Sequence, residues 1–480
     1  MSSLKTNVIL NYINTLASIV FPLITFPYAA RILLPEGIGL VNFQNSIIGY
    51  ITLLSSLGIP LYAVREVARV RDNIEERNRV TVEIAILSLI LALVGYIIVF
   101  VVGELVPQIN AHLSLFYILS LSILFTALGV SWFYTAIEDF KFITIRGLII
   151  RLLFVVALFL FVKSKADLLV YGVVIVGSTV GNDIINFIHL RKFINIFKID
   201  WNRVNIVRHL KPSLSIFVLN LSVSLYVQLN PVMLGFLSDN TQVGYYTAGS
   251  KLSNIILSVV TSMATVLIPH VSNMLQVHDT EKYKQLITKV YHYYMALAIP
   301  FTIGLIALSV PLILVICGKS FYDASYVTAI TAPVIIFISI TNIIGMQVLY
   351  PYGKENYVTY STIGGAVINL IVDIPLILLW GSKGAAISTV CAEFAVLAIQ
   401  VKLGRNYVPF KYFDDSIKLY ALSSIIMGIT VWLTCSLFEK AIIQLLVPTC
   451  VGVAVYALIL YYKKDEILFS ILRYLHVNVK

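Results

Sequence analysis

The sequence predicts an all-α membrane protein that crosses the bilayer about 14 times. Hydrophobic residues make up 59% of its 480 residues and charged residues only 12%, whereas about a quarter of the residues of a soluble domain are charged. The apolar residues fall into about 14 stretches of roughly 17 to 25 residues between Val8 and Tyr462. Because an α-helix needs about 20 apolar residues to cross the hydrocarbon core, each stretch is long enough to span it.

The spans are expected in a regular order along the chain. They are predicted to begin near Val8, Ile38, Val80, Leu113, Ile145, Leu168, Ser213, Gly244, Val290, Tyr326, Val358, Gly384, Leu419 and Ala441. No gap between them has the ~50 residues that a separate soluble domain needs, so no catalytic domain can lie between spans.

The distribution of cationic residues predicts the orientation of the chain. Of the 34 Lys and Arg residues, 26 lie in alternate gaps that would share one side of the membrane with both chain ends. Basic loops resist translocation, so both termini are expected in the cytoplasm. The net charge of +10 is spread over these short loops, which predicts contact with membrane lipids and no binding of nucleic acid.

A weak internal repeat divides the spans into two groups of six. Aligning Gly39 with Gly244 matches the chain after span 1 to the chain after span 7, and Pro27 then meets Pro231 after a one-residue gap. We therefore expect an N-terminal lobe at 1–211, a C-terminal lobe at 212–415 and two appended spans with a cytoplasmic tail at 416–480. Two such halves are typical of transporters that open a central cavity alternately to each side.

Three cations in or beside spans are candidates for binding an anionic substrate. Lys251 lies inside the predicted span 8, Arg151 lies inside span 5 and Arg31 lies at the end of span 1. A charge inside the bilayer is costly, so it commonly faces a partner or a water-filled cavity. The alternative for each is snorkelling of the long side chain toward the interface, or, for Arg31, capping of carbonyls in the adjacent turn.

Two carboxylates and two aromatic residues complete the predicted site. Asp183 and Asp373 lie inside spans and are candidates for carrying a coupling Na⁺ or proton, although structural pairing with a cation would also explain them. Tyr245 and Tyr246 lie near the proposed cavity end, where their rings could face sugars. The alternative is that they belong to the aromatic belt of the interface.

The sequence lacks the motifs of several enzyme classes. It has no phosphate-binding GxxxxGK[ST] loop, no GxSxG elbow and no His, Cys or carboxylate cluster with metal-ligand spacing. We therefore expect a protein that is not an enzyme and that has no metal site or bound cofactor. Work against a gradient would have to come from a Na⁺ or H⁺ gradient or from consumption of the product.

Three segments carry a resemblance to a known family. TFPYAARILLPEGIGLVNFQNSI (residues 25–47), YYTAGSKL (245–252) and INLIVDIPLILLWGSKGAAISTVCAE (368–393) resemble bacterial polysaccharide repeat-unit flippases. These form the Wzx-type branch of the multidrug/oligosaccharidyl-lipid/polysaccharide exporter superfamily. Two positions depart from the family pattern: Leu34 stands where Gly is usual, and Asp373 stands where Asn is frequent.

The resemblance implies a transporter of undecaprenyl-diphosphate-linked oligosaccharide in the bacterial cytoplasmic membrane. It would flip repeat units to the outer face for O-antigen, capsule or exopolysaccharide synthesis, beside the polymerase and chain-length machinery. Two alternatives stay open, a cation-coupled multidrug exporter of the same superfamily and a nontransporting scaffold for polysaccharide synthesis.

Overall fold

The computed structural model describes residues 4–195, 199–261 and 280–474. The chain forms two compact units, residues 1–244 and 245–480. Ten helices in the described residues are long and apolar enough to cross a membrane, and a shorter apolar helix covers Leu113–Gly129. The described residues contain no β-strand, so the prediction of an all-α protein with many membrane spans is confirmed.

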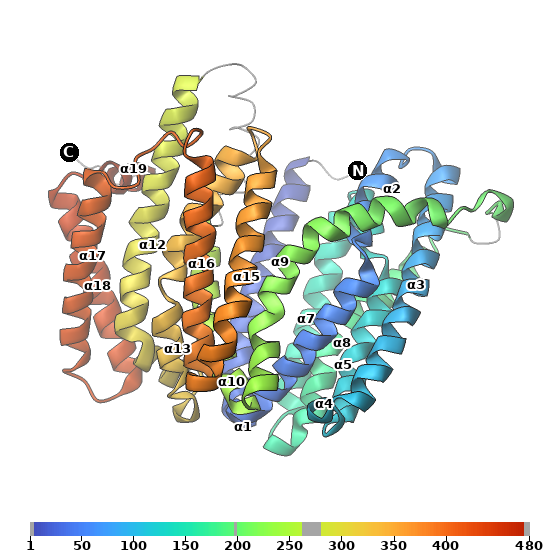
Figure 1. The fold of residues 1–480 in the computed structure, drawn as a ribbon, viewed down its shortest axis with the longest axis horizontal. Helices are drawn as coiled ribbons and strands as arrows, with labels where there is room; N and C mark the ends of the chain where they lie inside the picture. The colour runs from blue at the N-terminus through green and yellow to red at the C-terminus, as the bar shows by residue number, and fades with distance from the viewer. Residues whose placement is uncertain (1–3, 196–198, 262–279, 475–480) are drawn as a thin grey trace. The chain divides into compact units, whose positions relative to one another are not determined.

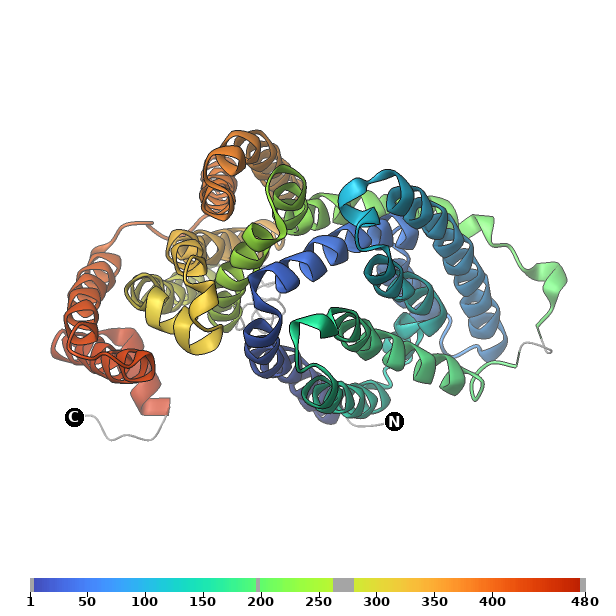
Figure 2. The same cartoon turned by 90° about the horizontal axis from the view of Figure 1, so that it is seen from below.

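The first unit is a bundle of long helices that run side by side (Figures 1 and 2). In it, α5 packs against α3 and α8, and α7 packs against α1 and α8. A buried apolar cluster that includes Phe133, Ile84 and Val67 forms its core. Its helices are α1 (Leu4–Ser56), α2 (Ile59–Arg69), α3 (Ile74–Leu105), α4 (Pro107–Asn110), α5 (Leu113–Gly129), α6 (Ser131–Ala136), α7 (Phe140–Phe161), η1 (Lys165–Asp167), α8 (Leu168–Leu190), η3 (Trp201–Arg203), η4 (Val207–His209) and α9 (Leu210–Leu237).

The second unit is built around the long helix α12. This helix packs against α13, α14, α17 and α18, while α15 and α16 form the most intimate pair of the unit. Its core includes Tyr291, Tyr294 and Ile343. Its helices are α10 (Asn240–Thr261), which begins at the end of the first unit, α12 (Thr280–Ile316), η5 (Lys319–Phe321), α13 (Ala324–Thr331), α14 (Val334–Asn342), η6 (Ile343–Leu349), α15 (Glu355–Trp380), α16 (Ser382–Gly404), α17 (Asp415–Cys435), α18 (Ala441–Tyr462) and α19 (Glu466–Tyr474).

The helices correspond to the predicted spans with one difference in continuity. The spans predicted from Val8 and Ile38 are two helices within the element α1, and they meet at Leu34, where the backbone is non-helical with φ 61° and ψ 177°. The span predicted from Tyr326 is a series of α13, α14 and the π-helix η6. The division into compact units falls after residue 244, because α9 packs on α1 and α2. The lobes at 1–211, 212–415 and 416–480 stay a prediction.

The aligned repeat reappears as a reciprocal contact between α1 and the start of α10. A Cβ placed on Gly39 would lie 1.6 Å from the carbonyl oxygen of Asn240, and a Cβ placed on Gly244 would lie 2.0 Å from that of Pro35. Pro35 and Asn240 are themselves equivalent in the alignment that matches Gly39 with Gly244. Each helix therefore needs a glycine at the same repeat position to let the other backbone approach.

We predict that Gly39→Ala and Gly244→Ala each lower the unfolding temperature of the detergent-purified protein. The added methyl group must displace a backbone carbonyl, and overpacking of this kind costs about 1–3 kcal/mol. Gly147→Ala is the matched control, since the nearest atom to its Cβ would be 3.6 Å away. The contact is not tight in solution if Gly39→Ala unfolds at the same temperature as this control.

We predict that Leu34→Gly gives a more stable protein than Leu34→Ala. Both substitutions remove the half-buried side chain, but only glycine adopts the positive φ of this position without strain, which costs about 1–3 kcal/mol. In an ordinary helix the order is reversed by about 1 kcal/mol. Thermal unfolding of the two variants checks the order, and Leu33→Gly and Leu33→Ala, at a fully buried neighbour, should show the ordinary one.

Candidate functional site

The helices α15 and α16 form a hairpin whose backbones touch. A single residue, Gly381 at φ 55°, separates them. A Cβ on Gly384 would lie 1.9 Å from the carbonyl oxygen of Leu376, and one on Gly365 would lie 2.3 Å from the side chain of Val396. Polar side chains on the facing sides of the two helices are therefore held at bonding distance and away from lipid.

Three of these side chains form a fully buried polar cluster. Asn369, Asp373 and Ser388 are each at most 1% exposed. The amide of Asn369 donates to the hydroxyl of Ser388 at 2.7 Å, and this hydroxyl donates back to the carbonyl oxygen of Asn369 at 3.1 Å. The hydroxyl of Ser388 thus binds Asn369 in both directions, and it also lies beside the carboxylate of Asp373.

The carboxylate of Asp373 lacks a hydrogen-bonding partner among the described residues. Both of its oxygens are buried and unsatisfied there, and Ser388 is its polar neighbour. A buried, unpaired carboxylate is very costly unless a cation or a proton neutralises it. Together with the side-chain oxygens of Asn369 and Ser388, it offers hard oxygen ligands of the kind that bind hard metal cations.

Asp183, the other candidate for ion coupling, has a different environment. It is 6% exposed and packs against Gly129 at the end of α5. The guanidinium of Arg146 on α7 acts on it electrostatically while donating from Nε to the side chain of Asn182 at 3.0 Å. A nearby cation thus offsets the charge of Asp183, whereas none does so for Asp373 in the described part of the chain.

Lys251 and the two tyrosines lie on α10 in the second unit. The hydroxyl of Tyr246 lies 3.0 Å from that of Thr389 on α16, and the ring of Tyr245 meets Phe321 edge-on at 6.3 Å. Lys251 is half-buried, and Cys317 at the end of α12 is a titratable group near it. The structure therefore brings Tyr246 next to the α15–α16 hairpin, and it places Tyr245 against Phe321.

Arg31 and Arg151 lie in the first unit and do not meet. Arg151 donates to both the backbone and side-chain oxygens of Asn14 at 3.1 Å. Arg31 is exposed and lies 17 residues farther along α1, or about 25 Å at 1.5 Å per residue. One small anion cannot contact both arginines.

A buried ion-pair network between α3 and the segment before α9 was not predicted as a site. Glu83, which is fully buried, accepts from the Nε of Arg208 at 2.9 Å and lies 2.8 Å from the Nε2 of His209. The Nδ1 of His209 lies 2.7 Å from the hydroxyl of Tyr62. Burial lowers the pKa of His209, because the charged ring loses its solvation there, although the bond to Glu83 opposes this shift. A neutral ring with its proton on Nε2 donates to Glu83 and accepts from the hydroxyl of Tyr62.

The network fastens the segment before α9 to α3 and α2. Glu83 also accepts from the backbone N–H of Asn205 at 2.8 Å. The sequence offered one signal for it, since a carboxylate inside the predicted third span demands a partner and the basic segment at 191–211 holds the available cations.

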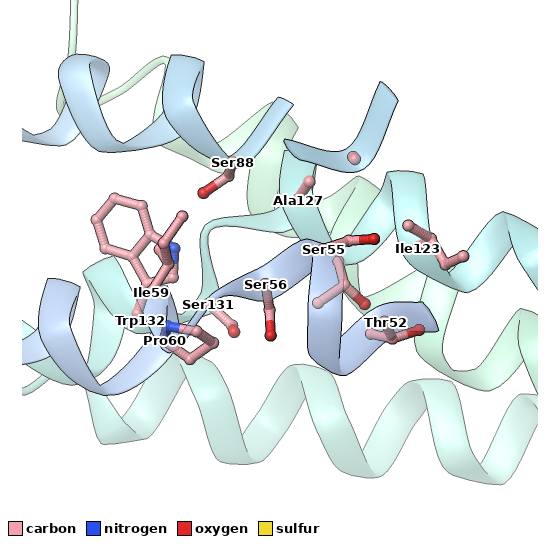
Figure 3. A pocket seen from close by; sticks show the side chains of 12 residues that line it. Thr52, Ser55, Ser56, Ile59, Pro60, Ser88, Ile123, Ala127, Ser131 and Trp132 are labelled. Carbon is pink, nitrogen blue, oxygen red and sulfur yellow. The ribbon is translucent and has the colours of Figure 1, made fainter. Parts of the chain in front are cut away.

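A small pocket lined by hydroxyl groups lies at the break between α1 and α2 (Figure 3). Its volume is about 40 Å³. The hydroxyls of Ser55 and Ser88 donate to carbonyls of their own helices at 2.7 and 2.9 Å, so they present only acceptor lone pairs to the pocket. No charged side chain lines it, and it has room for about three water molecules.

Comparisons with known proteins agree on the kind of molecule. A model of the family described as polysaccharide biosynthesis protein matches residues 4–275. A candidate O-antigen transporter of Escherichia coli strain K12 is 24% identical over 407 residues, which cover 84% of this chain and 97% of the relative.

Solved structures share the fold. The lipid II flippase MurJ in an inward closed conformation matches with a TM-score of 0.71 at 18% identity, over 95% of this chain and 99% of that chain. An inward-facing multidrug resistance transporter of the MATE family, in the MOP superfamily, matches with a TM-score of 0.63 at 14% identity, over 80% and 93% of the two chains. The predicted fold class is confirmed by these matches.

Proposed function

We propose that this chain, which belongs to the polysaccharide biosynthesis protein family, flips a lipid-linked oligosaccharide across the membrane by alternating access. The observation that carries the proposal is the similarity to an O-antigen transporter over 84% of this chain and 97% of that relative. The fold shared with a lipid II flippase and the internal repeat support it, since two related halves suit alternate opening. Flipping makes and breaks no covalent bond, so the protein is not an enzyme.

The proposed substrate is an undecaprenyl-diphosphate-linked repeat unit for O-antigen, capsule or exopolysaccharide synthesis. Its diphosphate requires cations, and the candidates are Lys251, Arg31 and Arg151. Arg151 is the weakest of them, because it already donates twice to Asn14. Tyr245 and Tyr246 are candidates for contacting the sugars.

The proposed setting is the bacterial cytoplasmic membrane with both termini in the cytoplasm. The concentration of 26 of the 34 cations in alternate gaps supports this orientation. Transport would then run from the cytoplasmic to the outer face. A polymerase and its chain-length machinery would take up the product there.

A bound cation or proton at Asp373 is the proposed means of coupling to an ion gradient. The support is the buried cluster of Asn369, Asp373 and Ser388, whose carboxylate has no described partner. Asp183 is the weaker candidate because Arg146 already acts on it. If a Na⁺ ion binds, the cluster supplies oxygen ligands from both α15 and α16, so binding would couple the two helices.

A cation-coupled multidrug exporter of the same superfamily is the second candidate function. The same unpaired carboxylate favours it, since an exported organic cation could also neutralise Asp373. Substitution of the proposed substrate-binding cations, Lys251 and Arg31, separates the two functions. It should abolish transport of an anionic substrate, whereas export of a cationic drug does not require these side chains. A nontransporting scaffold would tolerate these changes as well.

We predict that Lys251→Ala and Arg31→Ala abolish or strongly reduce surface polymer in a flippase-deficient strain that makes the cognate glycan. The wild-type chain should restore the polymer at matched membrane expression, because the diphosphate loses its counter-charge only in the variants. Lys418→Ala is the control, since Lys418 is exposed and pairs only with Asp415 of its own helix. Failure of the wild type, with glycan intermediates present, would overturn the assignment.

We predict that Na⁺ raises the unfolding temperature of the wild type and not that of Asp373→Asn. Binding at ten times the dissociation constant stabilises the folded state by about 1.4 kcal/mol. Scans in NaCl and in choline chloride at equal ionic strength measure the difference, with Asp183→Asn as the matched control. A Na⁺ response that persists in Asp373→Asn contradicts the site, while a wild type that responds to pH and not to Na⁺ assigns a proton instead.

A further inference from the structure

A second pocket lies where the first turns of α12 meet the starts of α17 and α19. It has a volume of about 760 Å³ and is lined by charged side chains of both signs. Lys284, Lys289 and Glu281 come from α12, and Glu466 comes from the first turn of α19. The floor includes Tyr420, which is 1% exposed and donates to Asp465 at 2.8 Å.

Some of these charges are already used inside the protein. His292 lies 2.6 Å from the carboxylate of Asp414, which caps α17. Asp465 accepts from Tyr420 with one oxygen and from the backbone N–H of Leu468 with the other. These groups stabilise the packing of α12, α17 and α19 around the pocket. Their bonds within the protein leave them less available to a ligand than the remaining charges.

Four charges of the pocket are left without an ion-pair partner within the described part of the chain. They are two cations, Lys284 and Lys289, and two carboxylates, Glu281 and Glu466. Equal numbers of both signs make the pocket unfavourable for a ligand of one sign alone. A ligand with a phosphate and an ammonium group would contact both.

The repeat provides an internal comparison for this pocket. The shift that aligns Gly39 with Gly244 also aligns Glu76-Arg77-Asn78-Arg79 with Glu281-Lys282-Tyr283-Lys284. A pocket of about 800 Å³ lies at this place in the first unit as well.

The two pockets differ in how their charges are satisfied. In the first unit, Arg79 pairs with Glu76 at 2.6 Å and Arg203 pairs with Asp200 at 3.2 Å. These four charges neutralise one another, whereas the corresponding Glu281 and Lys284 of the second unit form no such pair in the described structure. Glu75, Arg191 and Lys192 also line the first pocket, so the two pockets differ at the equivalent pair Glu76–Arg79 and Glu281–Lys284 and not in the presence of charge as such.

The position of the pocket fits the headgroup layer of a membrane. It lies at the beginning of the spans α12 and α17 and directly after the end of α18. Figure 1 shows α19 turned across the end of α18, and Ile467 of this helix is buried in the unit core. Charged lining at this depth meets lipid headgroups, while the exposed apolar side chains of α17 and α18 meet acyl chains.

We propose that this pocket binds a phospholipid with a zwitterionic headgroup, a phosphate diester joined to a primary ammonium, as in phosphatidylethanolamine. Lys284 and Lys289 contact the phosphate, and Glu281 and Glu466 accept hydrogen bonds from the ammonium group. An anionic glycerol headgroup gains only the first set of contacts. A trimethylammonium headgroup has no N–H to donate to the carboxylates.

The test is native mass spectrometry of the full chain released from vesicles that contain equal amounts of phosphatidylethanolamine, phosphatidylglycerol and phosphatidylcholine with the same acyl chains. We expect retained phosphatidylethanolamine to exceed each of the others by about five-fold, the ratio given by roughly 1 kcal/mol. Glu281→Gln with Glu466→Gln should remove this preference. Lys284→Gln with Lys289→Gln should reduce retention of all three lipids.

Lys418→Gln is the control, since this exposed lysine lies outside the pocket and pairs with Asp415. Equal or greater retention of phosphatidylglycerol by the wild type would overturn the proposal. So would a preference for phosphatidylethanolamine that survives both double variants. The readout is bound lipid rather than transport, so it does not depend on the proposed flippase activity.

Discussion

The crossing of α1 with the start of α10 depends on the close approach of the two backbones at Gly39 and Gly244. A glycine on each helix faces a carbonyl of the other, and neither contact can form unless α1 and the start of α10 are in register. Van der Waals packing of small residues is the main attraction between helices in lipid, because no hydrophobic force acts there. The rest of α1 packs against α9, α7, α3 and α5, so this crossing fixes the register of one part of the helix and the other helices of the unit hold the remainder.

The cost of a buried charge is met in three different ways in this chain. Glu83 is surrounded by Arg208, His209 and a backbone N–H. Asp183 interacts electrostatically with the nearby guanidinium of Arg146. Asp373 has an amide and a hydroxyl nearby that are occupied with each other. The first arrangement is complete and structural, whereas the last lacks a neutralising partner among the described residues.

The helical spans could be predicted from the sequence because the bilayer permits little else. A chain in hydrocarbon must satisfy its own backbone groups, so an apolar run of sufficient length becomes a helix. The break between the first two spans was predictable as well, since Pro35 and Gly37 follow Leu34 and such residues usually mark a turn; the structure places the non-helical backbone at Leu34 itself. The resemblance to flippases did single out Leu34, and its positive φ explains why glycine is usual there.

The sequence identified which residues are candidates for the site, but it did not predict which of them contact one another. Hydropathy identifies Asp373 and Lys251 as unusual, but the contact of Asp373 with Ser388 depends on a one-residue turn at Gly381. The bonds of Arg151 to Asn14 and of Tyr246 to Thr389 join residues more than 130 positions apart. Such pairs follow from helix packing, which periodicity and composition do not specify.

The hydroxyl-lined pocket has a mechanical consequence for the end of α1. Helix α1 ends at Ser56 because Leu57 and Gly58 have positive φ, so the last carbonyls of α1 leave the helical hydrogen-bond pattern, and in hydrocarbon this loss would be severe. The pocket lies at this break and is lined by acceptors that can anchor water, and water can donate to carbonyls at the end of a helix. Water in the pocket can therefore hydrogen-bond the peptide groups at the break, so the angle between α1 and α2 can change without exposing an unpaired peptide group to lipid.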